Sequence, residues 1–117
     1  MRFLIVIPTL NEHKNIEIIY KKIVKLYKQA HILFIDDNSD DGSKEEILDL
    51  RKKNKKVNYV FRKKKLGIGS AHKLGIKMAK KNNYRYVCTM DCDGTHEPKS
   101  INTMFKDIKK YNLIMTT

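Results

Sequence analysis

The stretch ILFIDDNSDDGS, residues 32–43, decides the fold class. Its first four residues form a continuous apolar run, which is typical of a strand buried on both faces. Asp36 and Asp37 follow where this strand should end, and residues 40–43 have the turn and N-cap chemistry that begins a helix. A strand that leads directly into a helix is the building unit of an α/β protein.

The rest of the chain repeats this alternation on both sides of the stretch. Apolar runs predict strands at 3–7, 32–35, 57–61, 86–90 and 113–116. Helical periodicity predicts helices at about 14–29 and 44–54, after residue 70 and after residue 98. Their expected inner faces are Ile16, Ile19, Ile23 and Leu26; Ile47 and Leu50; Ala71, Leu74, Gly75 and Met78; and, after Pro98, Ile101, Phe105 and Ile108. Short connections between such elements imply a parallel sheet with right-handed crossovers.

We therefore expect one α/β domain over residues 1–117. The chain stops within or just after its fifth predicted strand, and nothing that follows covers that strand. We expect this chain to be the N-terminal part of a larger domain, and we expect it to be inactive in catalysis by itself.

Composition excludes several classes of protein. With 117 residues, 41% of them hydrophobic, the chain can form one folded core. No apolar run approaches the roughly 20 residues of a membrane-spanning helix, and residues 1–8 resemble a first strand more than a signal peptide. Cys88 and Cys92 lack further Cys or His at zinc-site spacing, so we expect two reduced, buried thiols. We expect a cytoplasmic protein that can lie at the cytoplasmic face of the membrane.

The net charge of +12 narrows the choice of partners. Basic proteins commonly bind nucleic acid, anionic membranes or phosphorylated substrates. A nucleic-acid-binding module would interleave aromatic residues with lysines on one face. The aromatic residues here fall largely in the expected strand and helix cores, which disfavours nucleic acid as the partner.

Acidic residues concentrate where two predicted strands end. Six of the 13 acids lie within 36–41 and 91–93, and open parallel sheets bind ligands at the carboxyl ends of their strands. Asp91 and Asp93 are two residues apart in an extended segment, so both carboxylates can hold one Mg²⁺ or Mn²⁺ beside a diphosphate. Of Asp36 and Asp37, one can accept hydrogen bonds from a base or ribose while the other caps the following backbone. Loop capping alone is the alternative at both places.

Four motifs in this order resemble family 2 glycosyltransferases of the GT-A fold. They are VIPTLNE at 6–12, FIDDNSDDGS at 34–43, KLGIGSA at 65–71 and MDCDGTHEP at 90–98. Within the family the chain is most similar to dolichyl- or polyprenyl-phosphate mannosyltransferases, which transfer a hexose from GDP-mannose or a UDP-sugar to a lipid phosphate. The resemblance implies a Rossmann-like three-layer sandwich with a mostly parallel central sheet.

The resemblance also implies roles for single residues. The nucleotide sugar would contact Pro8, Leu10, Glu12, Ile35, Asp37, Asp91, Cys92 and Asp93. Asp91 and Asp93 would form the Asp-x-Asp pair of the catalytic site, with Asp93 as the direct ligand of Mg²⁺ or Mn²⁺ and Thr95 near the metal. Leu10 stands where the subgroup often has Tyr, and Gly94 and Thr95 also depart from its pattern, so the donor stays open between GDP-mannose and a UDP-sugar.

The implied reaction is an inverting displacement at the anomeric carbon, in which the metal stabilises the departing diphosphate. A lipid phosphate acceptor is largely ionised at neutral pH and needs no strong general base. A carbohydrate acceptor, as in cell-wall or surface polysaccharide synthesis, would need one and is the alternative. A signalling receiver domain is disfavoured, because its acid pair should follow the first strand, which here leads into PTLNE.

Overall fold

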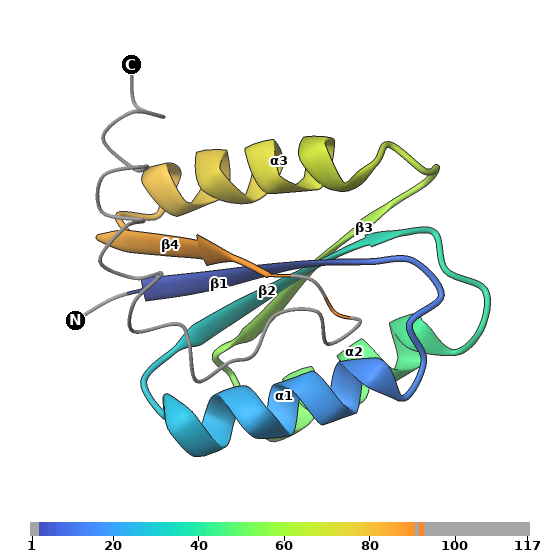
Figure 1. Cartoon of the computed structure of the whole chain (residues 1–117), viewed down its shortest axis with the longest axis horizontal. Coiled ribbons are helices and arrows are strands. Elements are labelled where there is room, and N and C mark those ends of the chain that lie inside the picture. Colours follow the sequence, from blue (N-terminus) through green and yellow to red (C-terminus); the bar gives the residue numbers. More distant parts are fainter. Residues whose placement is uncertain (1–2, 91, 93–117) are drawn as a thin grey trace.

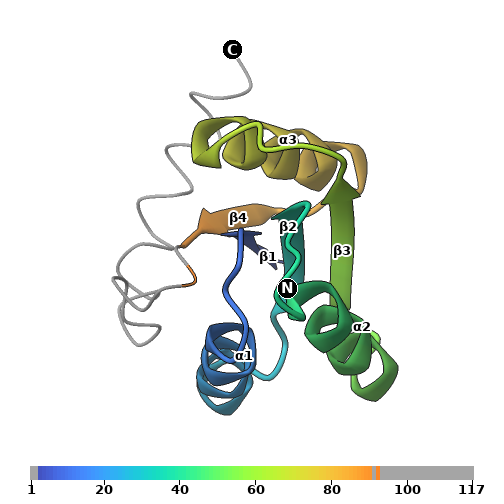
Figure 2. The ribbon, with the colours of Figure 1, turned by 90° about the vertical axis from the view of Figure 1, so that its right-hand side faces the viewer.

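A four-stranded parallel sheet forms the centre of the structure, a computed structural model in which residues 3–90 and residue 92 are described. The strands are β1 (Phe3–Thr9), β2 (His31–Asp37), β3 (Val57–Arg62) and β4 (Tyr86–Thr89), in the order β3-β2-β1-β4. The helices are α1 (Asn15–Leu26), α2 (Ser43–Lys53) and α3 (Ile68–Lys81). Helices α1 and α2 cover one face of the sheet and α3 covers the other, as Figures 1 and 2 show. This arrangement confirms the predicted three-layer α/β architecture with a parallel sheet.

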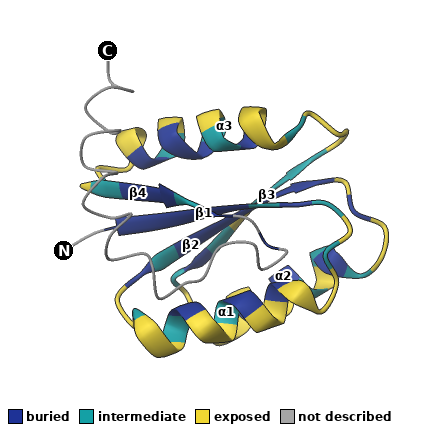
Figure 3. Ribbon diagram, in the orientation of Figure 1, coloured by how far each residue is buried: buried dark blue, intermediate teal, exposed yellow. Residues whose placement is uncertain are grey.

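The core lies on both faces of the two central strands, β1 and β2. Nearly all of their residues are buried, as the dark ribbon of Figure 3 shows. Each helix adds one buried stripe, formed by Ile16, Ile19 and Ile23 on α1, Ile47 and Leu50 on α2, and Ala71, Gly75, Ile76 and Ala79 on α3. Helices cover both faces of these two strands, which explains why their sequences are continuously apolar.

Helix α3 approaches the sheet closely at Gly75. A Cβ atom on Gly75 would lie 2.4 Å from Cγ1 and 2.6 Å from Cγ2 of Val6, which is fully buried in β1. Neither atom can easily move away, since Val6 is β-branched and held in a paired strand. The absence of a side chain at Gly75 therefore sets the distance between helix and sheet.

The prediction for one residue of the inner helix faces, Leu26, is wrong. Leu26 was expected to point inward, but it is 48% exposed because α1 ends at this residue, earlier than predicted. Tyr27, the next residue, packs edge-on against Phe3 with ring centroids 6.2 Å apart. The strand ends also shift: β2 extends through Asp37, and β4 ends at Thr89 instead of Met90. The predicted helix after Pro98 and the strand at 113–116 lie outside the described residues.

The outer edge of β3 is in contact with α2 through Arg51. Its Nη1 donates to the carbonyl oxygens of Lys55, at 2.6 Å, and Val57, at 2.9 Å. Val57 is the first residue of β3, so this arginine occupies backbone acceptors where the strand begins. None of the helices in the described ranges has the length and hydropathy required to cross a membrane.

Candidate functional site

Three loops meet at one edge of the sheet, where β1, β2 and β3 end. We call it the carboxyl edge; it lies at the right of Figure 1 and faces the viewer in Figure 2. The β1–α1 loop, the β2–α2 loop and the β3–α3 loop all leave the sheet here. Thr9 at the end of β1 is the register partner of Asp36 in β2, and Asp37 is the register partner of Arg62 in β3.

Asp36 is fully buried and bonded to both neighbouring segments. Its Oδ1 accepts hydrogen bonds from Oγ1 of Thr9 and from Oγ of Ser39, both at 2.6 Å, and its Oδ2 accepts one from the backbone N–H of Ser39 at 2.8 Å. This is the capping role that the sequence predicted for one member of the acid pair. The Asp36 carboxylate thus fixes the start of the β2–α2 loop against the end of β1.

The first two motif loops are bonded to each other. The backbone N–H of Asn11 donates to Oγ of Ser39 at 2.8 Å, and the backbone N–H of Glu12 donates to Oγ of Ser43 at 3.0 Å. In return the side-chain oxygen of Asn11 accepts from the backbone N–H of Asp40 at 3.1 Å. The PTLNE and DDNSDDGS segments therefore form one structural unit, whose short polar side chains replace the missing backbone partners of loops.

Asp41 extends this unit to the start of α2. Its Oδ1 accepts from the backbone N–H and the Oγ of Ser43, and its Oδ2 accepts from the backbone N–H of His13. Burial raises the pKa of Asp41, but these hydrogen bonds outweigh it and hold the pKa below its usual range. Gly42 between the two residues has a left-handed φ of 98°, a conformation that glycine adopts without steric cost.

Asp37 and Arg62 form a buried ion pair at the same edge. Nε of Arg62 lies 2.6 Å from Oδ1 of Asp37, and Nη2 lies 3.0 Å from Oδ2. The two side chains are only 8% and 9% exposed. This is the two-point geometry that a planar guanidinium makes with a carboxylate.

The same pair holds the β3–α3 loop. Oδ2 of Asp37 also accepts the backbone N–H groups of Leu66, at 3.0 Å, and Gly67, at 3.1 Å. Arg62 donates to the carbonyl oxygen of Gly67 and to Oγ of Ser70. Burial raises the pKa of Asp37, but the hydrogen bonds from Arg62, Leu66 and Gly67, together with the positive charge of Arg62, lower it by more. The carboxylate is therefore ionised and its oxygens are occupied within the protein.

The predicted nucleotide-sugar residues are brought together only in part within the described chain. Pro8 and Ile35 are register partners on adjacent strands; Pro8 is half-buried and Ile35 fully buried. Leu10 and Glu12 are half-buried in the β1–α1 loop, and Cys92 is buried. Asp91, Asp93 and Thr95 lie outside the described residues, so their predicted roles stay predictions.

Arg62 belongs to this edge although no sequence motif indicated it. The signal was its position as the last residue of a strand next to the one that ends in the acid pair, since parallel strands end side by side.

The described residues form no metal site by themselves. Within 3–90 and 92, no group of three or more His, Cys, Asp and Glu residues could hold a metal ion. Asp36 and Asp37 accept hydrogen bonds from protein donors on both oxygens. The acids of the predicted Asp-x-Asp pair, Asp91 and Asp93, with the hydroxyl of Thr95, are the hard oxygen donors that Mg²⁺ and Mn²⁺ prefer.

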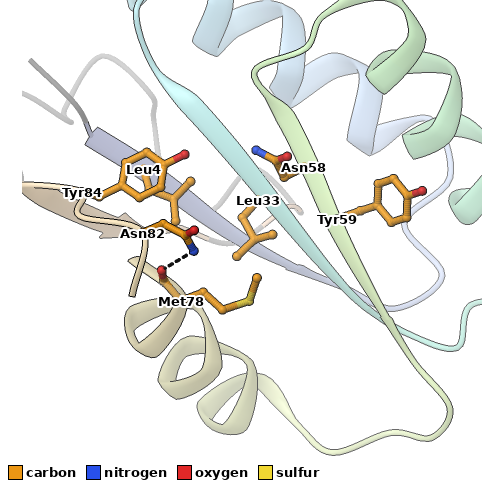
Figure 4. A pocket seen from close by; sticks show the side chains of 7 residues that line it. All are labelled: Leu4, Leu33, Asn58, Tyr59, Met78, Asn82 and Tyr84. Atoms are coloured by element: carbon orange, nitrogen blue, oxygen red, sulfur yellow. Dashed lines mark hydrogen bonds between the residues drawn. The ribbon is translucent and has the colours of Figure 1, made fainter. Parts of the chain in front are cut away.

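A cavity of about 300 Å³ lies away from this edge, toward the amino ends of the strands (Figure 4). It is lined by Leu4, Leu33, Asn58, Tyr59, Met78, Asn82 and Tyr84. These side chains carry no charge at neutral pH. The cavity therefore offers no carboxylate or imidazole to act as a base or as an anionic metal ligand, and the carboxyl edge is the better candidate site.

Comparison with known proteins shows which family the chain belongs to. The model of glycosyl transferase family 2 matches residues 4–117. The polyprenol monophosphomannose synthase of Mycolicibacterium smegmatis is 32% identical over 104 residues, which cover 88% of this chain and 39% of that protein. The undecaprenyl-phosphate mannosyltransferase of Micrococcus luteus is 25% identical over 98% of this chain and 47% of that protein. The dolichol-phosphate mannosyltransferase of Saccharomyces cerevisiae is 26% identical over 100% of this chain and 45% of that protein. The chain thus spans less than half the length of these relatives.

Solved structures share the fold at low sequence identity. Residues 1–349 of TarS from S. aureus superpose with a TM-score of 0.70 at 18% identity, covering 94% of this chain and 33% of that one. A mannosyltransferase from Pyrobaculum calidifontis, solved in complex with GDP-Man and Mn²⁺, gives 0.64 at 20% identity, covering 79% and 27%. These likenesses confirm the GT-A fold class that the sequence motifs predicted.

Proposed function

This chain belongs to glycosyl transferase family 2, and on that premise we propose that it forms the nucleotide-sugar-binding part of an enzyme that transfers a hexose to a polyprenyl or dolichyl phosphate. The acceptor class is supported by three relatives that are named for mannosyl transfer to such lipids. The donor is a nucleoside diphosphate sugar, either GDP-mannose or a UDP-sugar.

The observation that carries the proposal is the rigid pairing of two family motifs at the carboxyl edge. Ser39 and Ser43 accept the backbone N–H groups of Asn11 and Glu12 in the neighbouring loop, so the two loops keep one fixed arrangement without a ligand. A binding site that is already ordered loses less conformational entropy when its ligand arrives. In this proposal, Pro8, Leu10 and Glu12 line one side of the nucleoside site, and Ile35 and Asp37 the other.

Asp37 has a more specific role in this proposal than a single contact to ribose. Its oxygens already bind Arg62, Leu66 and Gly67, so it acts mainly by holding the β3–α3 loop beside the nucleoside. Any hydrogen bond to the ribose or base would use a remaining lone pair of the same carboxylate. Asp37 is in this respect a positioning residue as well as a binding residue.

In the proposed reaction a phosphate oxygen of the acceptor lipid attacks the anomeric carbon opposite the diphosphate. The new carbon–oxygen bond forms as the bond to the diphosphate breaks, which inverts the anomeric centre and releases the nucleoside diphosphate. The dianionic lipid phosphate needs no strong base. When bound by Asp93, with Asp91 and Thr95 nearby, Mg²⁺ or Mn²⁺ would supply the positive charge that stabilises the leaving diphosphate.

The test is calorimetric titration of the full chain with GDP and with UDP, in the presence of Mn²⁺ and then with excess chelator. We expect binding of one nucleotide with Mn²⁺ and a loss of about tenfold or more in affinity with chelator, since two carboxylates and a diphosphate repel without a cation. Equal affinity in both conditions would remove the metal from the proposal. Binding of neither nucleotide by a correctly folded chain would overturn the donor site itself.

A further inference from the structure

The second part of the chain carries no acidic residue over a long span. From Arg51 to Met90 there is no Asp or Glu, although Lys and Arg recur throughout. This span contains β3, the β3–α3 loop, α3 and β4. Among the described helices α3 alone covers its face of the sheet (Figure 2). Helix α3 carries basic residues and no acidic residue.

The outward side of α3 is a row of lysines. Lys73, Lys77 and Lys81 are spaced four residues apart and are all exposed, opposite the buried stripe that includes Ala71 and Ala79. Positive charge in the last turn of a helix compensates the helix dipole, which accounts for Lys81. Lys73 and Lys77 lie earlier in the helix and have no acidic neighbour along it, so the dipole does not account for them.

The end of the β3–α3 loop and the first residue of α3 add apolar side chains at one end of this row. Leu66 and Ile68 are 46% and 58% exposed, and they follow the exposed residues Lys63, Lys64 and Lys65. Exposed large aliphatic side chains beside lysines are the composition of a protein surface that enters a lipid headgroup region.

The loop backbone is fixed although these side chains are exposed. Asp37 accepts the N–H groups of Leu66 and Gly67, and Arg62 bonds to the carbonyl of Gly67. A Cβ atom at Gly67 would meet no described atom within 4 Å, so there is open space beside the loop at this residue. Presenting two apolar side chains from a fixed backbone costs little further entropy on binding.

We propose that α3 and the β3–α3 loop form a docking surface for an anionic lipid bilayer. In this arrangement Lys73, Lys77 and Lys81 face the anionic headgroups, and Leu66 and Ile68 enter the interface. The proposal rests on the proposed function only in that a lipid phosphate acceptor is reached at a membrane. Because Asp37 holds the loop, docking would bring the carboxyl edge close to that membrane.

Nucleic acid would also be attracted by the charge, but the side chains favour a bilayer. Between Arg62 and Lys81 there is no Phe, Tyr or Trp on which bases could stack. The exposed apolar residues are aliphatic, which suits insertion between lipids more than contact with bases.

The experiment is flotation of the full chain with vesicles of neutral phosphatidylcholine, and with vesicles that also contain phosphatidylglycerol. We expect binding to the anionic vesicles alone, weakened by high salt because the lysine contribution is screened. Lys73→Gln with Lys77→Gln should lower the partition coefficient about tenfold or more at low salt. Leu66→Ser with Ile68→Ser should lower it by about tenfold through lost apolar burial, and this loss should persist in high salt.

The matched control is Lys22→Gln with Lys25→Gln on α1, which removes the same charge from exposed positions on the opposite face. It should change the partition coefficient by less than about threefold, because those lysines face away from the bilayer. Thermal unfolding of each variant checks that all are folded. Three results would overturn the proposal: no binding to anionic vesicles, an equal loss in the α1 control, or no effect of the Leu66 and Ile68 pair.

A single-stranded oligonucleotide serves as the competing probe. Binding to it that depends on Lys73 and Lys77, with no vesicle binding, would assign the surface to nucleic acid instead. The vesicles contain no polyprenyl phosphate and no nucleotide, so failure here leaves the manganese-dependent nucleotide titration untouched. Loss of nucleotide binding with intact vesicle binding would count against the proposed function alone.

Discussion

Arg62 and Asp37 join the ends of β3 and β2 through two parallel contacts, at 2.6 Å and 3.0 Å. Asp37 uses the same carboxylate to hold the next loop through the N–H groups of Leu66 and Gly67. A residue at the end of β2 therefore holds the backbone of the loop that follows the neighbouring strand, β3. The buried ion pair therefore connects β2, β3 and the β3–α3 loop at the candidate site.

Replacing Arg62 should strongly destabilise the domain. Arg62→Ala leaves the buried Asp37 carboxylate without its cation, a change that costs about 3 kcal/mol or more in comparable buried pairs. Urea denaturation followed by circular dichroism measures the free energy of unfolding. The control is Lys63→Ala at the adjacent exposed position, which should change it by less than about 0.5 kcal/mol. Arg62→Ala within that same small range would show that the pair contributes little to stability.

The lowered pKa of Asp37 predicts a defined pH dependence. Since the folded-state pKa lies below the unfolded value, the unfolded chain takes up this proton first as the pH falls. The stabilisation is therefore complete above the unfolded pKa of about 4 and is lost as the pH falls through the folded pKa. Wild type should exceed Asp37→Asn in unfolding free energy at neutral pH, and the difference should shrink below about pH 4.

The exposed Asp49 on α2 provides the comparison for this experiment. Asp49→Asn should differ from wild type by less than about 0.5 kcal/mol, with little change in that difference across the same pH range. A difference between wild type and Asp37→Asn that stays constant down to the acid transition would contradict the assignment of this titration to Asp37.

Gly75→Ala should destabilise the domain by about 1–3 kcal/mol, because the added methyl group overlaps both Cγ atoms of Val6. Gly69→Ala in the same helix is the matched control: its Cβ meets nothing, so helix propensity should stabilise by up to about 1 kcal/mol. Combined with Val6→Ala, which removes the overlapping atoms, Gly75→Ala should cost about 1 kcal/mol less than it does alone. Additive costs in that double-mutant cycle would mean that the contact with Val6 is not the cause.

Two aspartates should differ in how they affect nucleotide binding. Asp93→Asn should weaken manganese-dependent binding about tenfold or more, because Asp93 is the proposed direct ligand of the metal. Asp37→Asn should weaken it less and should lower the affinity by a similar factor with and without Mn²⁺, because Asp37 acts on the nucleoside side. Calorimetry with Mn²⁺ and with chelator gives the four affinities, and the reverse order of effects would exchange the two assignments.

The sequence predicted the order of strands and helices because the buried face of each element requires apolar residues at a regular spacing along the chain. The apolar runs of β1 and β2 and the stripe Ile16, Ile19 and Ile23 were all found in the structure as expected. Leu26 was misplaced because it is the last residue of α1, where the predicted helix continued to residue 29, and Tyr27 is the residue that packs against Phe3 instead. Elements are therefore easier to predict than their last turns.

The sequence predicted where the candidate site lies, but it predicted few of the hydrogen bonds and ion pairs within it. Acidic residues after strands indicated the carboxyl edge, and a capping role for one of Asp36 and Asp37 was anticipated. Which of the two would cap, and which would be paired with Arg62, depends on the side-chain direction at successive strand positions and on the register of β3 against β2. That register is a tertiary property, so no local pattern in residues 32–43 contains it.

Arg51 has a consequence for the behaviour of the protein at high concentration. An outer strand with unpaired carbonyl groups can recruit a strand from another molecule, which is how many folded proteins begin to aggregate. The carbonyl oxygens of Lys55 and Val57 already accept hydrogen bonds from this arginine, so the first part of β3 offers fewer acceptors to an incoming strand. The guanidinium also places a positive charge beside that edge, which repels a second copy of the same basic chain. Arg51 thereby limits the pairing of another strand with the beginning of β3.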